Sequence, residues 1–578
     1  MGNKRVMPPA QENVPASPPI PGPCPHKIQI TKLPHTNSRL FGRETELTML
    51  DNAWADGINV LTLKAMGGTG KTSLLKHWLD QFVASDYRGA KAVFTWSFYS
   101  QGSAENKQVS TDDFFESALR FFGYTEEKLP APHDRGIQLA RLVAAQRALL
   151  ILDGLEPLQH PVGIFHGELK DQGLKALLQQ LAASNAGLCL ISSRQTVEEL
   201  RGKPETLVLQ HDLEQLQLKD GVELLRAIGV NGSDAELTDA VTEVAGHALA
   251  LNLLGNYVKT VLKGDIRQRD KIPGLMAERK DGQHAEKMLA AYETHLQSTD
   301  ASESDKAPQN RQLGSFIRNI WPWRKPAPQS RSRQALSVLY LMGLFDRPVS
   351  PGAIQCLQEA KIFGLTDALG SDADWCYAIE DLREQNLLNA VNSDYPENLD
   401  CHPLIREYFG RQLQSQQPEA WQQAHECLYA YYKALPEKEL PDSLEEMQPL
   451  FSAVAHGCAA GLHQQALDEV YWPRIKREGE QYIYRNLGAF SDDLAVVAHF
   501  FTTPWQMPAA GLTGSDKALL LNFAGFGLRA LGRLREAVEP MQAANDNVVK
   551  QEDWRNAASG ASSLSELQLT LGDITKAV

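Results

Sequence analysis

The sequence predicts an α/β domain with a doubly wound parallel sheet, followed by helical and mostly helical regions. Three observations support this architecture. The chain has 578 residues, and at roughly 150 residues per domain this length favours about four domains over one. Short apolar runs of strand length alternate with helical patterns between residues 39 and 209, which is typical of a parallel sheet. After residue 209 helical spacing dominates to the end of the chain.

Composition excludes several classes of protein. Apolar residues make up 43% and charged residues 22%, so most of the chain can fold around a core. The net charge of −14 argues against bulk electrostatic binding of nucleic acid, although a local basic face remains open. No apolar run approaches the roughly 20 residues that span a bilayer. Seven scattered cysteines without a CxxC pair favour a reducing environment, so we expect a cytoplasmic protein with no membrane partner.

Residues 1–38 are interpreted as a proline-rich, flexible leader. Eight prolines fall within the first 25 residues, and proline lacks a backbone donor and fixes φ, which excludes a helix or a central strand there. An extended polyproline II conformation is expected. The alternative is a short docking motif of the PxxP type between Pro15 and Pro18.

The α/β domain is expected over residues 39–209. Five apolar runs are short enough for buried strands, and stretches with helical spacing separate them. The expected strands are Asn59–Leu63, Ala92–Trp96, Ala148–Leu152, Gly187–Ser192 and Leu207–Leu209. Strands that alternate with helices in this way predict a doubly wound parallel sheet.

The strongest motif runs from Ala65 to Thr72, between a predicted strand and a predicted helix. This is the context of a phosphate-binding loop (P-loop), whose glycines let backbone N–H groups surround phosphates at a helix N-terminus. Lys71 would reach the β- and γ-phosphates of a nucleotide, and the Thr72 hydroxyl would bind Mg²⁺. Ala65 replaces the usual glycine, which is tolerable only if its φ is negative. The candidate nucleotide-binding residues of the loop are Gly67, Gly68, Thr69, Gly70, Lys71, Thr72 and Ser73.

Charged residues at the ends of two later strands are candidate catalytic groups beside Lys71. Asp153 ends an apolar strand and would contact Mg²⁺ together with Thr72. Glu156 would polarise the attacking water as a general base; the alternative is a surface glutamate at the start of a loop. Arg194 would sense the γ-phosphate through a bidentate contact; the alternative is an exposed arginine at a strand end.

Four further ranges divide the rest of the chain by their patterning. A helical lid domain is expected first, then a mobile polar insertion, then a domain of helices with a short β-like segment at Leu388–Val391, and finally a helical region. In this order the ranges are 210–297, 298–333, 334–415 and 416–578. Gly229 and Gly246 are expected to break helices within the lid.

The last region contains a weak internal repeat. The segment from Leu531 to Leu534 recurs 40 residues later, from Leu571 to Ile574, with glycine in the same second position. A helix-turn-helix repeat needs glycine at its turn and a small residue where its helices cross, so the region is expected to be a solenoid of the tetratricopeptide (TPR) kind. The chain stops early in the last unit, and since solenoids need capping ends, we expect a longer natural array.

Together these motifs resemble the STAND class of signal-transducing P-loop ATPases, close to the NB-ARC type of apoptotic and plant-resistance switches and bacterial sensor proteins. The resemblance covers about Leu40 to Phe409, and the matching segments occur in the family's order. They are Phe41–Glu44, Met66–Thr72, Trp96–Gln101, Leu152–Glu156, Ser192–Arg194, Gly246–Leu251 and Cys401–Leu404. The resemblance implies an ATPase core, a small helical lid and, over 334–415, a winged-helix domain.

The resemblance also implies a nucleotide site that these domains share. Leu40, Phe41 and Arg43 would border the adenine, and His402 of the winged-helix domain would touch the β-phosphate of bound ADP. This sequence departs from the family at two points. Ala248 stands where the lid motif usually has the proline that contacts the base, and the aspartate that usually follows the winged-helix histidine is absent. A histidine beside proline is otherwise as easily a structural residue.

The expected function is an ATP/ADP-dependent signalling switch with slow ATP hydrolysis. Bacterial members of the family act in regulation or in defence against phage, so the resemblance implies such a role. A protein or peptide trigger would bind the TPR-like region, the active protein would form homo-oligomers, and the output would come from a separate effector protein or from sequence missing here. Two alternatives remain: a transcription regulator whose winged helix binds DNA, and a TPR scaffold whose nucleotide site is only structural.

Overall fold

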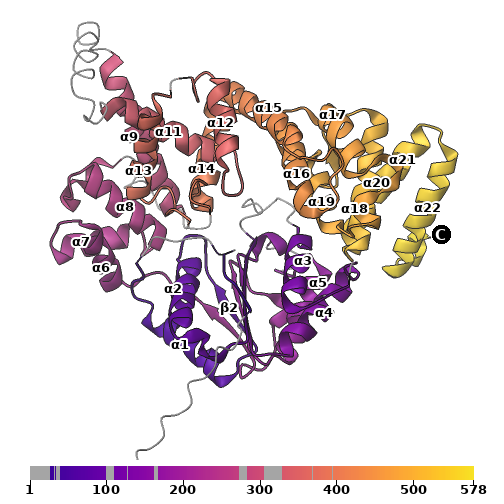
Figure 1. Cartoon of the computed structure of the whole chain (residues 1–578), viewed down its shortest axis with the longest axis horizontal. Helices are drawn as coiled ribbons and strands as arrows, with labels where there is room; N and C mark the ends of the chain where they lie inside the picture. The colour runs from indigo at the N-terminus through magenta and orange to yellow at the C-terminus, as the bar shows by residue number, and fades with distance from the viewer. Residues whose placement is uncertain are drawn as a thin grey trace, which may run out of the picture.

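The first domain is built on a six-stranded sheet in the order β1-β3-β4-β5-β2-β6, and all neighbouring strands pair in parallel (Figure 1). The computed structural model describes residues 27–31, 33, 39–98, 110–126, 128–161, 167–272, 283–304, 328–367, 369–392 and 395–577. The strands are β1 (Lys27–Gln29), β2 (Val60–Lys64), β3 (Ala92–Ser97), β4 (Ala148–Asp153), β5 (Leu188–Ser193) and β6 (Val208–Asp212). The predicted doubly wound parallel sheet is confirmed, and the five predicted strand runs fall on β2 to β6.

Helices cover both faces of this sheet. One face packs against α1 (Glu44–Asp56) and α2 (Lys71–Ala84), and the other against α3 (Asp112–Phe122), α4 (Pro132–Ala144) and α5 (Gln172–Ala183). Neighbouring strand residues point to opposite faces, so Ile151 joins the first core and Leu152 the second. This double burial explains why the strands read as continuous apolar runs. Short helical turns are η1 (Asp86–Gly89), η3 (Glu156–Leu158) and η4 (Glu198–Leu200).

Strand β1 corrects the expectation of a flexible leader over residues 1–38. Lys27–Gln29 pairs in parallel with Ala92–Phe94 at the edge of the sheet, and Leu33 is buried against the α1 and α2 core. Residues 26–33 contain no proline, and an edge strand needs only one hydrogen-bonded side, so the segment after Pro25 is free to pair. Residues 1–26, including the PxxP segment, lie outside the described residues.

The regions expected as lid and winged-helix domain share one hydrophobic core. Gly229 and Gly246 have positive φ angles and follow the ends of lid helices, as the sequence predicts. Leu388–Val391 forms no strand, so that prediction is wrong; within it the Asn389 N–H donates to the Asp400 carbonyl at 2.8 Å, next to an antiparallel bridge between Val349 and Leu399. The elements are α6 (Leu218–Ile228), α7 (Asp234–Glu243), α8 (Ala248–Thr260), η5 (Ile266–Lys271), α9 (His284–Ser304), α11 (Pro328–Met342), α12 (Pro351–Ala360), α13 (Asp372–Glu384) and α14 (Pro403–Gln416).

The insertion expected over 298–333 is helical at both of its described ends. Helix α9 continues to Ser304, and α11 begins at Pro328. Residues 305–327 lie outside the described residues. Among the helices that the structure describes, none is long and apolar enough to cross a membrane.

The C-terminal region is helical and lies beside the α3, α4 and α5 side of the sheet (Figure 1). Its repeat is visible as two helical hairpins whose turns contain Gly532 and Gly572, with φ angles of +75° and +81°. The elements are α15 (Pro418–Ala434), α16 (Leu444–Ala459), α17 (His463–Ala466), η6 (Leu467–Ile475), η7 (Glu478–Glu480), α18 (Tyr482–Arg485), α19 (Phe490–Ala498), β7 (Phe501–Thr503), β8 (Met507–Pro508), α20 (Gly514–Ala530), α21 (Leu534–Lys550), α22 (Trp554–Thr570) and α23 (Ile574–Ala577). The short antiparallel pair of β7 and β8 was not expected from the sequence.

Candidate nucleotide-binding site

The P-loop joins the end of β2 to the start of α2. Gly68 and Gly70 take positive φ angles of +78° and +101°, which glycine adopts without strain. Ala65 is not among the positive-φ residues, so a side chain is tolerated where the strict pattern has glycine. The Thr69 hydroxyl donates to the Met66 carbonyl at 2.9 Å, which closes the loop on itself. The loop therefore presents its backbone at the N-terminus of α2, the geometry that binds phosphate groups.

The Lys71 side chain lies inside this loop. Its Nζ donates to the carbonyl oxygens of Ala65 at 2.6 Å and Met66 at 3.2 Å. Only 6% of the side chain is exposed. Burial lowers the pKa of Lys71, while the charges of Glu156 and Asp153 act in the opposite direction. The Lys71 ammonium group is thus held at the loop by two backbone carbonyl oxygens. A phosphate oxygen could take the place of these carbonyls as its hydrogen-bond acceptor.

Asp153, at the end of β4, is surrounded by hydroxyl groups. Its carboxylate accepts hydrogen bonds from Thr72 at 3.0 and 3.1 Å, from Ser192 at 2.5 Å and from Ser97 at 3.4 Å. Burial raises the pKa of Asp153, and the donors from Ser192 and Thr72 oppose that shift. Thr72 and Asp153 meet because β2 and β4 end at the same edge of the sheet. Two oxygen side chains beside a phosphate loop fit Mg²⁺, which keeps most of its ligands as water and phosphate oxygens.

Glu156 stands between two cations. Its Oε1 lies 3.8 Å from Lys71 Nζ and 3.7 Å from Arg194 Nε, and the residue is 7% exposed. Arg194 flanks the loop itself, because a Cβ added to Gly67 would lie 3.3 Å from its Nη2. The four residues predicted as catalytic therefore lie in one cluster: Lys71, Asp153, Glu156 and Arg194. Glu156 is buried, so it is not the surface glutamate that the alternative interpretation expected.

The lid contacts the P-loop through the start of α8, a contact that sequence reasoning missed. The Leu249 N–H donates to the Gly68 carbonyl at 3.0 Å. His247 Nδ1 accepts the N–H of Ala250 at 3.2 Å, which leaves Nε2 as the donor to the Gly67 carbonyl at 2.9 Å. The available signal was the position of His247, directly after a helix-breaking glycine and within the lid motif. Two hydrogen bonds thus join the lid directly to the phosphate loop.

His402 caps the first turn of α14, and its ring is close enough to Arg194, His247 and Lys71 to be affected by their charges. Its Nδ1 accepts the Leu404 N–H at 3.2 Å, so a neutral ring carries its proton on Nε2. Burial lowers the pKa of His402 to about 3, and the charges of Arg194, His247 and Lys71 add to the shift. His402 is therefore a neutral side chain with one hydrogen-bond donor available near the phosphate loop.

The residues expected at the adenine occupy the junction of the first domain and the lid. Arg43 is 4% exposed and donates to the carbonyls of Thr69 at 3.3 Å and Glu214 at 2.8 Å. It therefore braces the P-loop against the segment that leads into the lid. Phe41 packs on the core shared by the lid and the winged-helix region, whereas Leu40 packs on the α1 and α2 core. Their contact with adenine stays a prediction.

No protein-family model matches this chain, and no curated protein matches it. Among solved structures, the chain is similar to a STAND protein with a tetratricopeptide repeat sensor from Pyrococcus horikoshii, with 13% identity over 96% of this chain and 77% of the other, and a TM-score of 0.45. A Walker-type ATPase of Pyrococcus abyssi matches 66% of this chain and 99% of its own length, with 14% identity and a TM-score of 0.28. The Aeropyrum pernix ORC1 protein, solved in complex with DNA, matches 66% of this chain and 94% of its own, with 16% identity and a TM-score of 0.29. At such low identities and TM-scores, none of these similarities assigns a function.

Proposed function

We propose that this chain is an ATP/ADP-dependent signalling switch of the STAND kind, with slow ATP hydrolysis. The observation that carries the proposal is the direct hydrogen bonding of the lid to the phosphate loop, from His247 to the Gly67 carbonyl and from Leu249 to the Gly68 carbonyl. Phosphates bind the amide groups of such a loop. A shift of the loop backbone on nucleotide binding or hydrolysis would therefore also move the Gly67 and Gly68 carbonyls to which the lid is hydrogen-bonded. Nucleotide identity would thereby bias two arrangements of the lid.

The chemical roles follow from the charges and donors around the loop. Lys71 and Arg194 would contact the β- and γ-phosphates, and their departure from Glu156 would free that carboxylate to orient and deprotonate the attacking water. Thr72 and Asp153 would hold Mg²⁺, which when bound neutralises phosphate charge. His402, neutral with its proton on Nε2, would donate to the β-phosphate of ADP.

The output of the switch is also part of the proposal. A protein or peptide trigger would bind the C-terminal helical hairpins, the ATP-bound protein would form homo-oligomers, and a separate effector protein would receive the signal. A role in bacterial regulation or antiphage defence is proposed on the family resemblance alone.

DNA binding by the winged-helix region is disfavoured by charge. In a helix-turn-helix the second helix enters the major groove, and here that position belongs to α13, which follows α12. Helix α13 has five acidic residues and one basic residue: Asp372, Asp374, Glu380, Asp381, Glu384 and Arg383. DNA phosphates would repel such a surface.

Titration calorimetry with Mg-ADP and Mg-ATP tests the proposal. Wild type and Lys76→Ala should bind both nucleotides, because Lys76 lies on the same helix and pairs with Asp80 away from the loop. Lys71→Ala should lose binding by about tenfold or more, since it removes the cation that neutralises phosphate. Hydrogen exchange over 246–251 should also differ between the ADP-bound and ATP-bound protein. Equal heats in all three proteins, or the same protection with both nucleotides, would refute the switch.

A further inference from the structure

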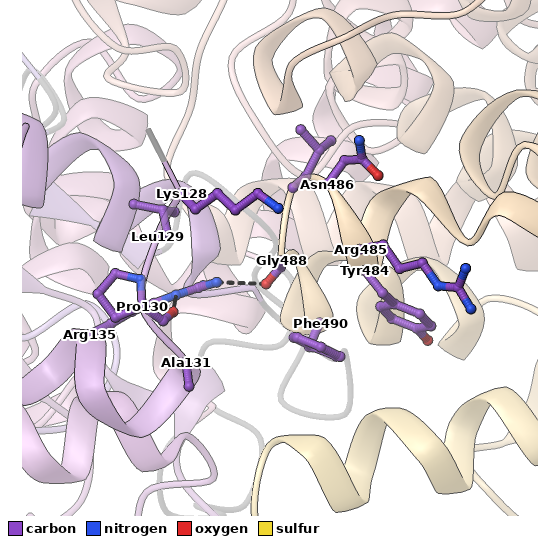
Figure 2. A pocket seen from close by; sticks show the side chains of 11 residues that line it. Lys128, Leu129, Pro130, Ala131, Arg135, Tyr484, Arg485, Asn486, Gly488 and Phe490 are labelled. Atoms are coloured by element: carbon purple, nitrogen blue, oxygen red, sulfur yellow. Dashed lines mark hydrogen bonds between the residues drawn. The ribbon is translucent and has the colours of Figure 1, made fainter. Parts of the chain in front are cut away.

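The C-terminal helical region contacts the α/β domain at a buried ion pair that belongs to that domain. Arg135 on α4 donates to Asp112 Oδ1 on α3 at 2.5 Å, and the two residues are 1% and 2% exposed. Each also reaches across the joint: Arg135 Nη2 donates to the Gly488 carbonyl at 2.6 Å, and Asp112 Oδ2 accepts the N–H groups of Ser491 at 2.7 Å and Asp492 at 2.9 Å. Figure 2 shows the Arg135 to Gly488 bond. Both residues line a cavity of about 190 Å³. This contact holds the C-terminal region against the first domain.

A second contact brings the turn of the α20–α21 hairpin to the same domain. A Cβ added to Gly532 would lie 2.5 Å from Gln172 Cγ at the start of α5, so the turn fits there only because residue 532 lacks a side chain. One turn later, Glu536 is paired with Arg533 at 2.7 Å and lies 3.8 Å from His160 Nε2. The equivalent turn of the next hairpin, at Gly572, has nothing within 4 Å of such a Cβ.

The surface that this turn covers is tied to the segment that carries Glu156. Lys170 Nζ donates at 3.1 Å to the carbonyl of Pro157, the residue directly after Glu156. The backbone N–H of Lys170 donates to the Leu158 carbonyl at 2.7 Å, and the His160 N–H donates to the Glu168 carbonyl at 2.8 Å. Residues 156–160 and 168–170 thus form one short antiparallel pair, which is called the clamp below. Both ends of this clamp, His160 and Lys170, face the first turn of α21.

We propose that the first turn of α21 is a brace for Glu156: when the C-terminal region is docked, it keeps Lys170 on the Pro157 carbonyl and so holds Glu156 in position for hydrolysis. Lys170 and Gly532 are positioning residues in this scheme. Undocking of the C-terminal region would slow hydrolysis and prolong the ATP-bound state. The inference rests on the proposed function, since it assumes that Glu156 acts on the attacking water.

The surroundings of Lys170 support this role. Burial lowers the pKa of Lys170 to about 8, and the charge of Arg533 adds to the shift while Glu536 opposes it. A lysine shielded from water in this way depends on the few acceptors within its reach, of which the Pro157 carbonyl is one. Removal of α21 would expose the ammonium group to water, which competes for that bond. The turn that carries Glu156 would then lose the hydrogen bond from Lys170 to the Pro157 carbonyl.

Two glycine variants of the full-length protein test the brace. Gly532→Ala and Gly572→Ala impose the same strain, since both glycines have positive φ, but only the first places a methyl group against Gln172. For Gly532→Ala we expect kcat for ATP hydrolysis to fall about tenfold or more, because loss of position by about 1 Å costs on the order of 100-fold, while the Kd for Mg-ATP stays within about twofold. Hydrogen exchange over 155–161 should become faster. Gly572→Ala should match wild type in all three measurements.

A lysine variant keeps the inference testable if Gly532→Ala fails to fold. Lys170→Met retains the apolar stem and removes only the donor, so it should reproduce the fall in kcat and the faster exchange over 155–161. An unchanged or raised kcat in both Gly532→Ala and Lys170→Met would overturn the brace, as would an equal fall in Gly572→Ala. The exchange measurement needs no nucleotide. If the wild type binds no nucleotide, the proposed function fails, whereas unchanged exchange over 155–161 in the nucleotide-free variants refutes the brace itself.

Discussion

Removal of the Asp112 carboxylate is expected to open the joint between the C-terminal region and the first domain. In Asp112→Ala, the buried guanidinium of Arg135 loses its counter-charge, and two backbone N–H groups lose their acceptor. Because Asp112 and Arg135 both belong to the first domain, what the joint itself loses is the two hydrogen bonds to the Asp112 carboxylate, and bonds to a charged group are worth about 1.5–3 kcal/mol each. Asp492 reduces this cost: burial and the charges of Asp113 and Asp112 raise its pKa, so without Asp112 it ionises more readily beside Arg135. The lower end for the two bonds together, about 3 kcal/mol, corresponds to about a 100-fold larger opening constant.

Hydrogen exchange of the full-length protein measures this opening. The amides of Ser491 and Asp492 should exchange about 100-fold faster in Asp112→Ala than in wild type, because their N–H groups bond to the Asp112 carboxylate across the joint. Asp134→Ala is the control: Asp134 lies in the first turn of α4 and is exposed, so its loss should cost about 0.3–1 kcal/mol through the helix dipole alone. Protection of Ser491 and Asp492 that is the same in Asp112→Ala, Asp134→Ala and wild type would refute the reasoning.

Three further variants test the nucleotide site. Glu156→Gln should lower ATP turnover by roughly 10²- to 10⁴-fold with little change in ATP affinity, because only the general base is lost, and steady-state turnover near the wild-type rate would exclude that role. His402→Ala should weaken ADP binding by the same factor at pH 5 and at pH 8, since burial and nearby cations lower the pKa of His402 to about 3 and the ring stays neutral throughout; calorimetry showing a loss that grows towards pH 5 would contradict this. His247→Ala removes one bond between lid and loop, worth about 0.5–1.5 kcal/mol, and also the acceptor of the Ala250 N–H. The lid contact is therefore followed at Leu249, whose N–H bonds to the Gly68 carbonyl: its exchange should rise roughly two- to tenfold, and unchanged exchange there would show that the His247 bond does not hold the lid.

The sheet and the P-loop were predictable because their causes are local. A strand buried on both faces must be apolar throughout, and the run Ala148–Leu152 shows this directly. Glycine is favoured where φ is positive, as at Gly68 and Gly70, so the glycines in the loop sequence predict the backbone conformation of the loop. Asp153 was found for a related reason: parallel strands place their carboxyl ends at one edge, so a charged residue after an apolar run lies beside the loop.

Contacts between distant segments could not be predicted in the same way. The bond from His247 to the Gly67 carbonyl joins residues 180 positions apart, and nothing in either local pattern specifies it. The bonds from Arg43 to the carbonyls of Thr69 and Glu214 are of the same kind, because they join residues 26 and 171 positions apart and no local pattern specifies them. Strand β1 was missed because three residues after a proline-rich stretch have too short a pattern to read, and only the free edge of β3 explains their pairing.

The lid and the winged-helix region should move as one body. They share a hydrophobic core, and the buried Glu293 on α9 accepts hydrogen bonds from Tyr340 on α11 at 2.9 Å and from Tyr408 on α14 at 2.6 Å. A rotation that separated the two regions would break both tyrosine bonds to this carboxylate, and bonds to a charged group are worth about 1.5–3 kcal/mol each. Rotation about the segment between β6 and α6 avoids that cost, but it breaks the contacts of His247 and Leu249 with the loop together and moves His402 away with them. The response to nucleotide should therefore be all-or-none, since no intermediate position keeps one set of contacts and loses the other.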